Sequence, residues 1–341
     1  RGYIAAAYSL LYDDFAYPVI NSAVFFLDDF PSPVPMGNGE YISKYFHRDI
    51  ASFYSSVWWP DMLELGKRYG IKYTGLIIES YDDKTAPPFE RYQDVSRFNY
   101  FGRMLLSEGG EIGYHGYNHQ PLCFDGFDYK GKVDYHLWHS EEGAAQSVQE
   151  MADFCKTLFP ENNASVYVPP SNILSEEGRT MLVSRFPQIK TLSGVYLKED
   201  YEYEQEFCVS GDGIVELPRI TSGTQIDGYM HWSALNELNF HFVSSHFMHP
   251  DDVLDEDRGA AKGWNSMRDT LEQYLRWLAD SAPSLRHQTG SEASGAVQRY
   301  DGLGLRRIST PEGLTLEIDN FHDEAYFLAR IRGGASRKVT G

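Results

Sequence analysis

Short apolar runs alternate with longer amphipathic stretches along most of the chain, and this alternation predicts repeated strand–helix units. The apolar runs have the composition of buried strands; they are Ala23–Leu27, Lys72–Ile78, Glu111–Tyr114, Ser165–Val168, Lys190–Val195, Ile214–Leu217 and Asn239–Phe247. Apolar positions at helical spacing mark five further stretches, which are Pro60–Tyr69, Phe98–Ser107, Ser140–Leu158, Ser175–Arg185 and Asn265–Asp280. Two end signals support these helices, since Gly70 stops the first and Ser140 caps the third.

A strand–helix order repeated six or seven times favours parallel strands that close, or nearly close, into a barrel. We therefore expect an α/β fold, a distorted barrel of the (β/α)7 type, over residues 15–285. The pattern changes after residue 286, where three apolar runs surround a Pro-Glu-Gly turn; they are Leu303–Ser309, Leu314–Ile318 and Ala325–Ile331. We expect residues 286–335 to form a small C-terminal antiparallel β extension and residues 336–341 to form a disordered tail.

The chain is strongly acidic, with 49 Asp and Glu residues against 30 Lys and Arg residues and a formal net charge of −19. This charge repels phosphate backbones and argues against nucleic acid as a partner. The sequence contains neither a signal peptide nor an apolar run long enough to cross a membrane. We expect an extracytoplasmic location, with any membrane attachment through a segment that this sequence does not include; the oligomeric state is not predicted.

Cysteine content adds little. Cys123, Cys155 and Cys208 allow one disulfide and leave one thiol over, and their spacing matches neither a zinc knuckle nor a redox CxxC motif.

The first candidate for chemistry is FFLDDFPSP, in which Asp28 and Asp29 follow a predicted strand. Two carboxylates this close resist being ionised together unless a cation lies beside them. An adjacent Asp pair is also common in turns and helix caps, so this piece alone does not establish a site.

The second candidate is EIGYHGYNHQPL, in which His115 and His119 follow another strand. If one helical turn follows Tyr114, positions i and i+4 lie on one face and both imidazoles can reach one metal ion. Two His and one Asp would form a facial triad that leaves positions open for water and substrate. Two histidines in a loop can equally serve packing.

The third candidate is FHFVSSHFMHPDD, which offers His241, His246 and His249. A histidine at the end of a strand can act as a general acid with a pKa near neutrality. His249 fits that place best, His246 would fit if the strand ended earlier, and His241 is expected within the strand.

Together the three pieces carry more weight than any one of them. Each follows a predicted strand of a parallel barrel, and the carboxyl ends of such strands meet on the face where catalytic loops lie.

In this order the motifs resemble those of polysaccharide deacetylases of the NodB-homology type, carbohydrate esterase family 4 and its relatives, over about residues 20–285. FLDDFPSP is similar to T-F-D-D-G-P, which implies Asp28 as general base and Asp29 as metal ligand. HGYNH is similar to H-[S/T]-x-x-H and implies His115 and His119 as the other ligands, and FMHPDD implies His249 as the acid.

YVPPSN lies where that family has F-R-P-P-Y-G, so the resemblance implies that the backbone N–H of Ser171 helps to hold the oxyanion. Phe30 replaces the glycine after the Asp pair, and Val168 replaces the arginine that orients the base, a task for which Arg219 is a candidate. With these departures the chain looks closest to the divergent exopolysaccharide deacetylases of carbohydrate esterase family 18, which act on galactosaminogalactan or Pel-like polymers.

The resemblance implies an enzyme that removes N-acetyl groups from an N-acetylhexosamine polysaccharide with a divalent metal ion. His and carboxylate ligands suit Zn²⁺, and Co²⁺ or Ni²⁺ would also fit. Two alternatives stay open: an amidohydrolase of the same superfamily that acts on a small amide, and a carbohydrate-binding module with a degenerate site. An open groove lined by aromatic residues, such as Trp58, Trp59 and Trp138, would favour a polymer over a small amide.

Overall fold

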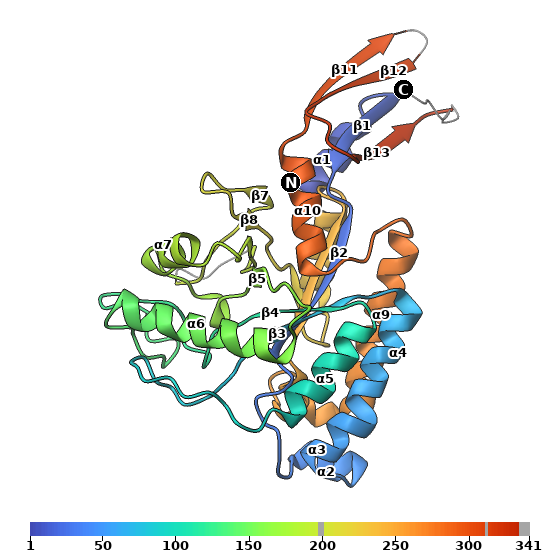
Figure 1. Cartoon of the computed structure of the whole chain (residues 1–341). Coiled ribbons are helices and arrows are strands. Elements are labelled where there is room, and N and C mark those ends of the chain that lie inside the picture. Colours follow the sequence, from blue (N-terminus) through green and yellow to red (C-terminus); the bar gives the residue numbers. More distant parts are fainter. Residues whose placement is uncertain (197–200, 311–312, 334–341) are drawn as a thin grey trace.

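The computed structural model describes residues 1–196, 201–310 and 313–333, and its centre is a curved sheet (Figure 1). Within these residues the sheet has nine strands in the order β7-β8-β6-β5-β4-β3-β2-β10-β9. All neighbouring pairs are parallel except β7 and β8. The strands are β2 (Ser22–Phe30), β3 (Tyr73–Ile77), β4 (Glu111–Tyr114), β5 (Val166–Tyr167), β6 (Thr191–Leu192), β7 (Cys208–Val209), β8 (Val215–Glu216), β9 (Thr221–Ser222) and β10 (Val243–Met248).

One extended segment closes this sheet into a barrel. β8 pairs with β6 at one end of the strand order, and β9, five residues later in the chain, pairs with β10 near the other end. The backbone N–H of Arg219 donates to Gly194 on the first side (2.9 Å), and that of Ile220 donates to Ser245 on the second (2.8 Å). Pro218 lies between β8 and β9 and has no N–H to donate, which explains why this extended segment is divided into two strands. The fold is therefore the distorted (β/α)7-type barrel that the sequence predicts.

Helices surround the barrel, and Figure 1 shows α4, α5 and α9 on one side of it and α6 and α7 on another. The helices are α1 (Gly2–Ser9), α2 (Glu40–Phe46), α3 (Ile50–Phe53), α4 (Trp59–Tyr69), α5 (Ser96–Ser107), α6 (Glu141–Leu158), α7 (Glu176–Arg185), α8 (Gly228–Leu238), α9 (Trp264–Ser281) and α10 (Gly290–Asp301). The predicted end signals are confirmed, because the Ser140 hydroxyl accepts a hydrogen bond from the N–H of Gly143 (3.1 Å) and Gly70 ends α4 in the left-handed conformation.

The sequence misplaced one stretch before β10. The predicted strand Asn239–Phe247 begins four residues too early, because the N–H groups of Phe240, His241 and Phe242 all donate to the carbonyl of Glu237. These bonds form a tight turn at the end of α8, with Phe242 at φ 53°. The expectation that His241 is a strand residue is therefore wrong.

The tryptophans named as possible groove residues belong to the core instead. Trp58, Trp59 and Trp138 are all buried, each at most 1% exposed. Trp59 stacks on Phe101 of α5, and Trp58 packs edge-on against Trp59. These three rings therefore do not line an open groove and do not favour a polymer over a small amide; their size suits them to filling the space between helices and sheet.

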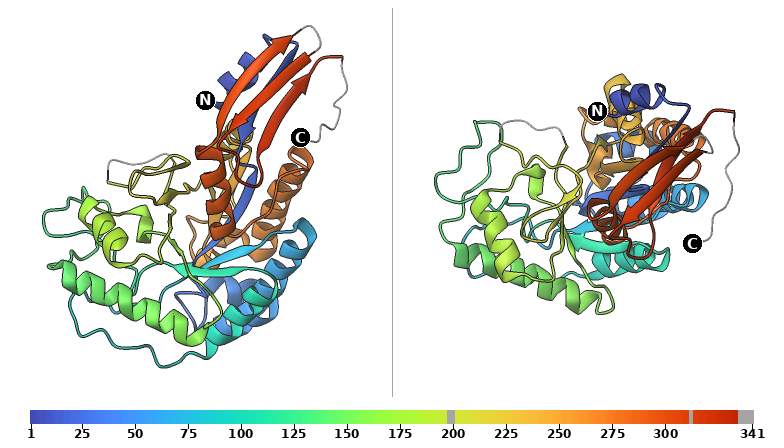
Figure 2. Two further views of the ribbon diagram at one scale, coloured as in Figure 1. Left: turned by 45° about the horizontal axis from the view of Figure 1, so that its top comes forward. Right: turned by 90° about the horizontal axis from the view of Figure 1, so that it is seen from above.

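The C-terminal strands and one N-terminal strand project together from the barrel, as Figure 2 shows. β1 (Asp14–Val19) pairs antiparallel with β13 (Tyr326–Ile331), and β11 (Gly304–Thr310) pairs antiparallel with β12 (Gly313–Asp319). α10 joins this part to the barrel, where the hydroxyl of Ser294 bonds with that of Thr191 in β6 (2.7 Å). The domain boundaries at residues 285 and 335 stay predictions, and the tail predicted for residues 336–341 lies outside the described residues.

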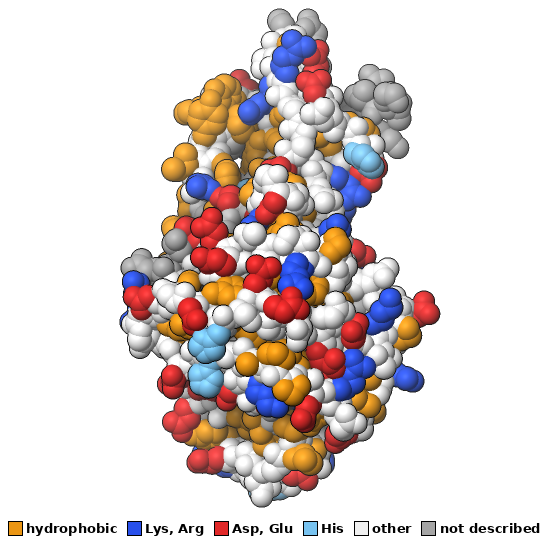
Figure 3. Space-filling model, turned by 60° about the vertical axis from the view of Figure 1, so that its left-hand side comes forward, with side chains coloured by type: hydrophobic (Ala, Val, Ile, Leu, Met, Phe, Trp, Pro, Cys, Tyr) orange, Lys and Arg blue, Asp and Glu red, His pale blue; other side chains and the backbone are white. Residues whose placement is uncertain are grey.

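Two further points concern the whole described chain. Cys123, Cys155 and Cys208 are all free thiols, and no helix in the described ranges is both long and apolar enough to cross a membrane. Figure 3 shows acidic side chains spread over the face that it displays, in keeping with the net charge of −19.

Candidate active site

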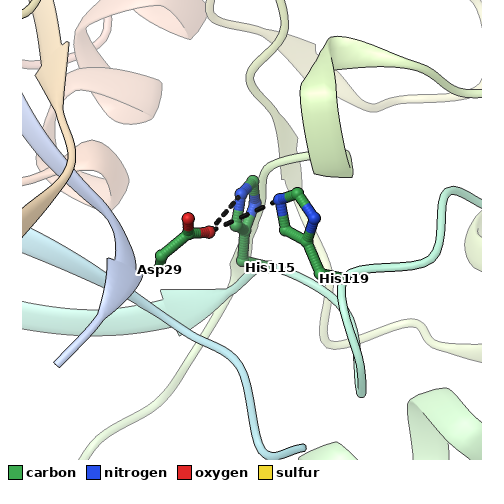
Figure 4. Close-up of side chains that lie close together, drawn as sticks. All are labelled: Asp29, His115 and His119. Atoms are coloured by element: carbon green, nitrogen blue, oxygen red, sulfur yellow. Dashed lines mark ion pairs between the residues drawn. The ribbon is translucent and has the colours of Figure 1, made fainter. Parts of the chain in front are cut away.

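Asp29, His115 and His119 meet at the carboxyl end of the barrel strands, as Figure 4 shows. Asp29 lies near the end of β2, and both histidines follow β4. Oδ1 of Asp29 lies 3.4 Å from Nε2 of His115 and 3.4 Å from Nε2 of His119. The sequence placed these three side chains around one point, and the structure brings them there.

The backbone reaches this arrangement without a helical turn after Tyr114. Residues 115–120 form an irregular loop in which Gly116 has φ 88° and His119 has φ 60°. A left-handed backbone at His119 is unfavourable for most residues and is typical of functional sites. A helical turn is thus not what brings His115 and His119 together, although both imidazoles face Asp29.

Hydrogen bonds fix both imidazoles through their Nδ1 atoms. Nδ1 of His115 lies 2.8 Å from the carbonyl of Val168, to which it can only donate. Nδ1 of His119 lies 3.2 Å from the hydroxyl of Tyr135. In a neutral imidazole whose Nδ1 carries the proton, Nε2 keeps its lone pair. This arrangement of an outer partner on each histidine is usual around bound metal ions.

The three side chains fit a divalent cation. Oδ1 of Asp29 is buried and has no hydrogen-bond partner among the described residues, which is costly without a compensating charge. A tetrahedral ion with bonds of about 2.1 Å separates its ligand atoms by about 3.4 Å, which matches both measured separations from Asp29. Burial lowers the pKa of His119 to about 4, so its imidazole is neutral at pH 7 and available as a ligand.

Asp28 points to a different partner from that of Asp29. Its Oδ2 forms an ion pair with Arg219, and both side chains are nearly inaccessible to solvent. Burial by itself would raise the pKa of Asp28, but the charge and hydrogen bond of Arg219, with the charge of His249, outweigh burial and lower it. The structure therefore places Arg219 where the sequence could only suggest it, against the carboxylate expected to act as base.

His249 also approaches Asp28, with its Nε2 3.8 Å from Oδ2, the same oxygen that pairs with Arg219. Its Nδ1 faces Asp252 at 3.4 Å, and Arg258 holds that carboxylate in turn at 3.1 Å. Burial would lower the pKa of His249, but the contact with Asp252 and the charge of Asp28 raise it to about 9. His249 thus carries a proton at neutral pH beside Asp28, the carboxylate expected to act as base.

The two competing histidines lie elsewhere. His246 is buried in β10, where its Nδ1 bonds with the Thr221 hydroxyl (2.9 Å) and its ring packs on Phe25. His241 is buried against Glu237. Of the three histidines, only His249 lines the cavity that contains Asp28 and Asp29.

Ser171 lies in a short turn after β5, with φ 50° at Ser171 and φ 59° at Asn172. Its hydroxyl lies 2.6 Å from that of Tyr135, the same tyrosine that contacts His119. The side-chain oxygen of Asn172 accepts a hydrogen bond from Arg219. The turn is thereby tied to both the ligand histidine and the partner of Asp28.

A cavity of about 410 Å³ connects these groups, and all seven site residues predicted from the sequence line it. They are Asp28, Asp29, His115, His119, Ser171, Arg219 and His249. Sequence reasoning missed Tyr135, which lies in a loop without a recognisable motif. It also missed Asp252, although its position three residues after His249 is the spacing of a capping box, which the structure contains.

The family described as "Uncharacterised protein conserved in bacteria (DUF2194)" matches residues 1–341. No curated protein matches the chain.

Several solved structures resemble the fold at low sequence identity. One is a candidate polysaccharide deacetylase from Mycobacterium smegmatis, with 14% identity, a TM-score of 0.49, and coverage of 82% of this chain and 91% of that chain. A CE4 family pseudoenzyme from Bacillus anthracis has 12% identity, a TM-score of 0.42 and coverage of 82% and 66%. The peptidoglycan deacetylase PdaC from Bacillus subtilis has 12% identity, a TM-score of 0.39 and coverage of 81% and 91%. These similarities concern the backbone fold alone, and they assign neither an activity nor a substrate to this chain.

Proposed function

The chain belongs to the DUF2194 family of bacterial proteins, and we propose that it is a metal-dependent N-deacetylase that acts on an N-acetylhexosamine polysaccharide. One observation carries the proposal. A three-residue ligand set, a buried carboxylate beside it and a protonated histidine all face one cavity. The motif order around these residues, which resembles that of the NodB-homology deacetylases, supports the same chemistry.

An ion held by Asp29, His115 and His119 would polarise both the attacking water and the acetamide carbonyl. Asp28, kept ionised by Arg219, accepts the proton that the water gives up as it attacks. The backbone N–H of Ser171 stabilises the negative charge that develops on the carbonyl oxygen. His249 then donates its Nε2 proton to the sugar nitrogen as the C–N bond breaks, because an amine anion is a very poor leaving group. The products are acetate and a free amino sugar.

Three finer assignments belong to this proposal. We assign Zn²⁺ as the metal, because two His and one Asp suit it, with Co²⁺ or Ni²⁺ as working substitutes. We assign an exopolysaccharide of GalNAc or GlcNAc units as substrate, as the resemblance to the Pel-type deacetylases implies. An extracytoplasmic location follows from such a substrate.

Acetate release from N-acetylated hexosamine oligomers, measured on metal-free and Zn²⁺-loaded protein, tests the proposal. Loaded protein should release acetate, and a chelator should abolish the release until metal is returned. Asp29→Ala should lose both bound metal and turnover, whereas Asp28→Asn should keep the metal and lose turnover. Turnover in metal-stripped Asp29→Ala protein would rule out this mechanism, and a loaded wild-type protein that releases no acetate from GlcNAc or GalNAc oligomers would rule out the activity.

A further inference from the structure

A second, larger cavity adjoins the catalytic one. Its volume is about 960 Å³ against about 410 Å³, and it extends between residues 202–206 and α8. Five residues line both cavities, namely Asn172, Glu202, Arg219, Ser222 and Phe247. The two cavities are therefore neighbours that share part of their walls, and a substrate unit bound near Asp28 lies close to the second cavity.

The residues at this junction are held firmly. Arg219, already paired with Asp28, places its guanidinium 3.9 Å above the ring of Phe247. That ring lies 5.8 Å from the imidazole of His249, measured between centroids. The shared wall of the two cavities is thus built from residues that also contact the base and the acid.

Exposed aromatic rings line the far part of this second cavity. Tyr229 and Trp232, one turn apart on α8, lie nearly parallel with their centroids 5.8 Å apart. They are 58% and 50% exposed, and with Tyr3 (40%) they form a contiguous group of exposed rings, which is the kind of patch that marks binding sites. Tyr3 of α1 stacks on Trp232 at 5.9 Å and fixes its orientation. Flat rings held in this way offer a surface for the apolar C–H face of a pyranose ring.

Among the described residues, the lining leaves neither arginine free for an anionic polymer. Its charged residues are Glu202, Glu204, Glu206, Glu237, Arg1 and Arg219, and the two arginines form ion pairs with Glu206 and Asp28 respectively. Neither guanidinium is therefore available to pair with a uronic acid or a phosphate. This part of the lining suits a chain of neutral N-acetylhexosamines.

We propose that this second cavity is an extended subsite that binds the sugar units next to the one being deacetylated, with Trp232 and Tyr229 as its stacking surface. This inference rests on the proposed function, because it concerns further units of the same substrate. It predicts that the protein prefers long oligomers over short ones. Residues of α8, which is far from the metal ligands in the sequence, should determine this preference.

The test compares a dimer and a hexamer of N-acetylhexosamine as substrates for the Zn²⁺-loaded full chain. In the wild-type protein kcat/KM should be higher for the hexamer. In Trp232→Ala and in Tyr229→Ala the hexamer-to-dimer ratio should fall about fivefold to tenfold, the loss expected for a stacking contact. Tyr100→Ala, which removes an equally exposed tyrosine (53%) from α5, should leave the ratio unchanged. An unchanged ratio in both α8 variants would overturn the proposal.

A binding measurement separates this result from failure of the proposed function. Calorimetric titration of the hexamer into the Asp28→Asn protein reports binding without turnover, and adding Trp232→Ala should weaken that binding by a similar factor. If the wild-type protein releases no acetate but hexamer binding still depends on Trp232, the proposed enzyme activity is refuted and the subsite is retained. If the wild-type protein releases acetate but Trp232→Ala leaves hexamer binding unchanged, the proposed activity is retained and the subsite is refuted.

Discussion

The guanidinium of Arg219 pairs with the carboxylate of Asp28 across 191 positions of sequence, and neither side chain is exposed to solvent by more than 2%. A charge buried this deeply is tolerated only when it is paired. The pair therefore has two tasks, to keep Asp28 ionised as a base and to avoid an uncompensated charge inside the barrel.

Arg219→Met should destabilise the protein by about 3 kcal/mol, because it leaves the Asp28 carboxylate buried without its partner. Urea denaturation followed by circular dichroism measures this loss. Adding Asp28→Asn to Arg219→Met should recover a large part of it, since both charges are then gone. If the double variant were as unstable as the sum of the two single variants, the two side chains would not be coupled.

Tyr135→Phe should weaken metal binding by about tenfold or more, because the hydroxyl that orients His119 through Nδ1 is removed. Competition for Zn²⁺ against a chromogenic chelator measures the affinity directly. Tyr129→Phe is the matched control, since that ring packs beside Tyr135 but its hydroxyl makes no bond to His119. Equal affinities in the two variants would contradict an orienting role for Tyr135.

His249→Ala should lower kcat for N-acetylated sugars by about 10²-fold to 10⁴-fold, the usual contribution of a general acid. The same variant should lose no more than about tenfold on an aryl acetate, because a phenolate leaves without being protonated. Acetate release from both substrates at saturating concentration gives the comparison. Equal losses on amide and ester would show that His249 does not act by protonating the leaving nitrogen.

His246 should make the protein less stable in mild acid. Burial lowers its pKa from 6.5 to about 4. Between these values the imidazole binds a proton in the unfolded chain but not in the folded protein. The resulting loss of stability begins near pH 6.5 as the pH falls and reaches about 3 kcal/mol near pH 4.

Urea denaturation at several pH values between 7 and 4 measures this contribution. His246→Gln should show a shallower fall in stability than the wild-type protein over that window, because Gln does not titrate. His47→Asn is the control, since His47 is exposed and Asn also tolerates its left-handed backbone. A wild-type slope that persists in His246→Gln would assign the acid sensitivity to other groups.

Much of this architecture could be predicted from the sequence, because buried strands and capped helices leave local signals. The ligand set was also predictable, since Asp29, His115 and His119 each follow a strand and parallel strands bring such positions to one rim. α8 escaped prediction because its exposed positions include Tyr229 and Trp232, which remove the polar face that normally identifies a surface helix.

Other features depend on tertiary contacts that leave no local signal. The pairing of β1 with β13 joins the two ends of the chain, and no pattern within either strand specifies its partner. The loop that carries His119 differs from the expected turn because of positive φ angles at Gly116 and His119. The sequence also could not distinguish buried Trp58 from exposed Trp232.

The break at Pro218 has a consequence for how the molecule fails. Arg219 is the next residue, so the hydrogen bonds that seal the barrel wall also hold the counter-charge of Asp28 in place. A fluctuation that breaks these hydrogen bonds also separates Arg219 from the Asp28 carboxylate. Loss of catalytic activity should thus precede global unfolding, because Asp28 loses the partner that holds it in position.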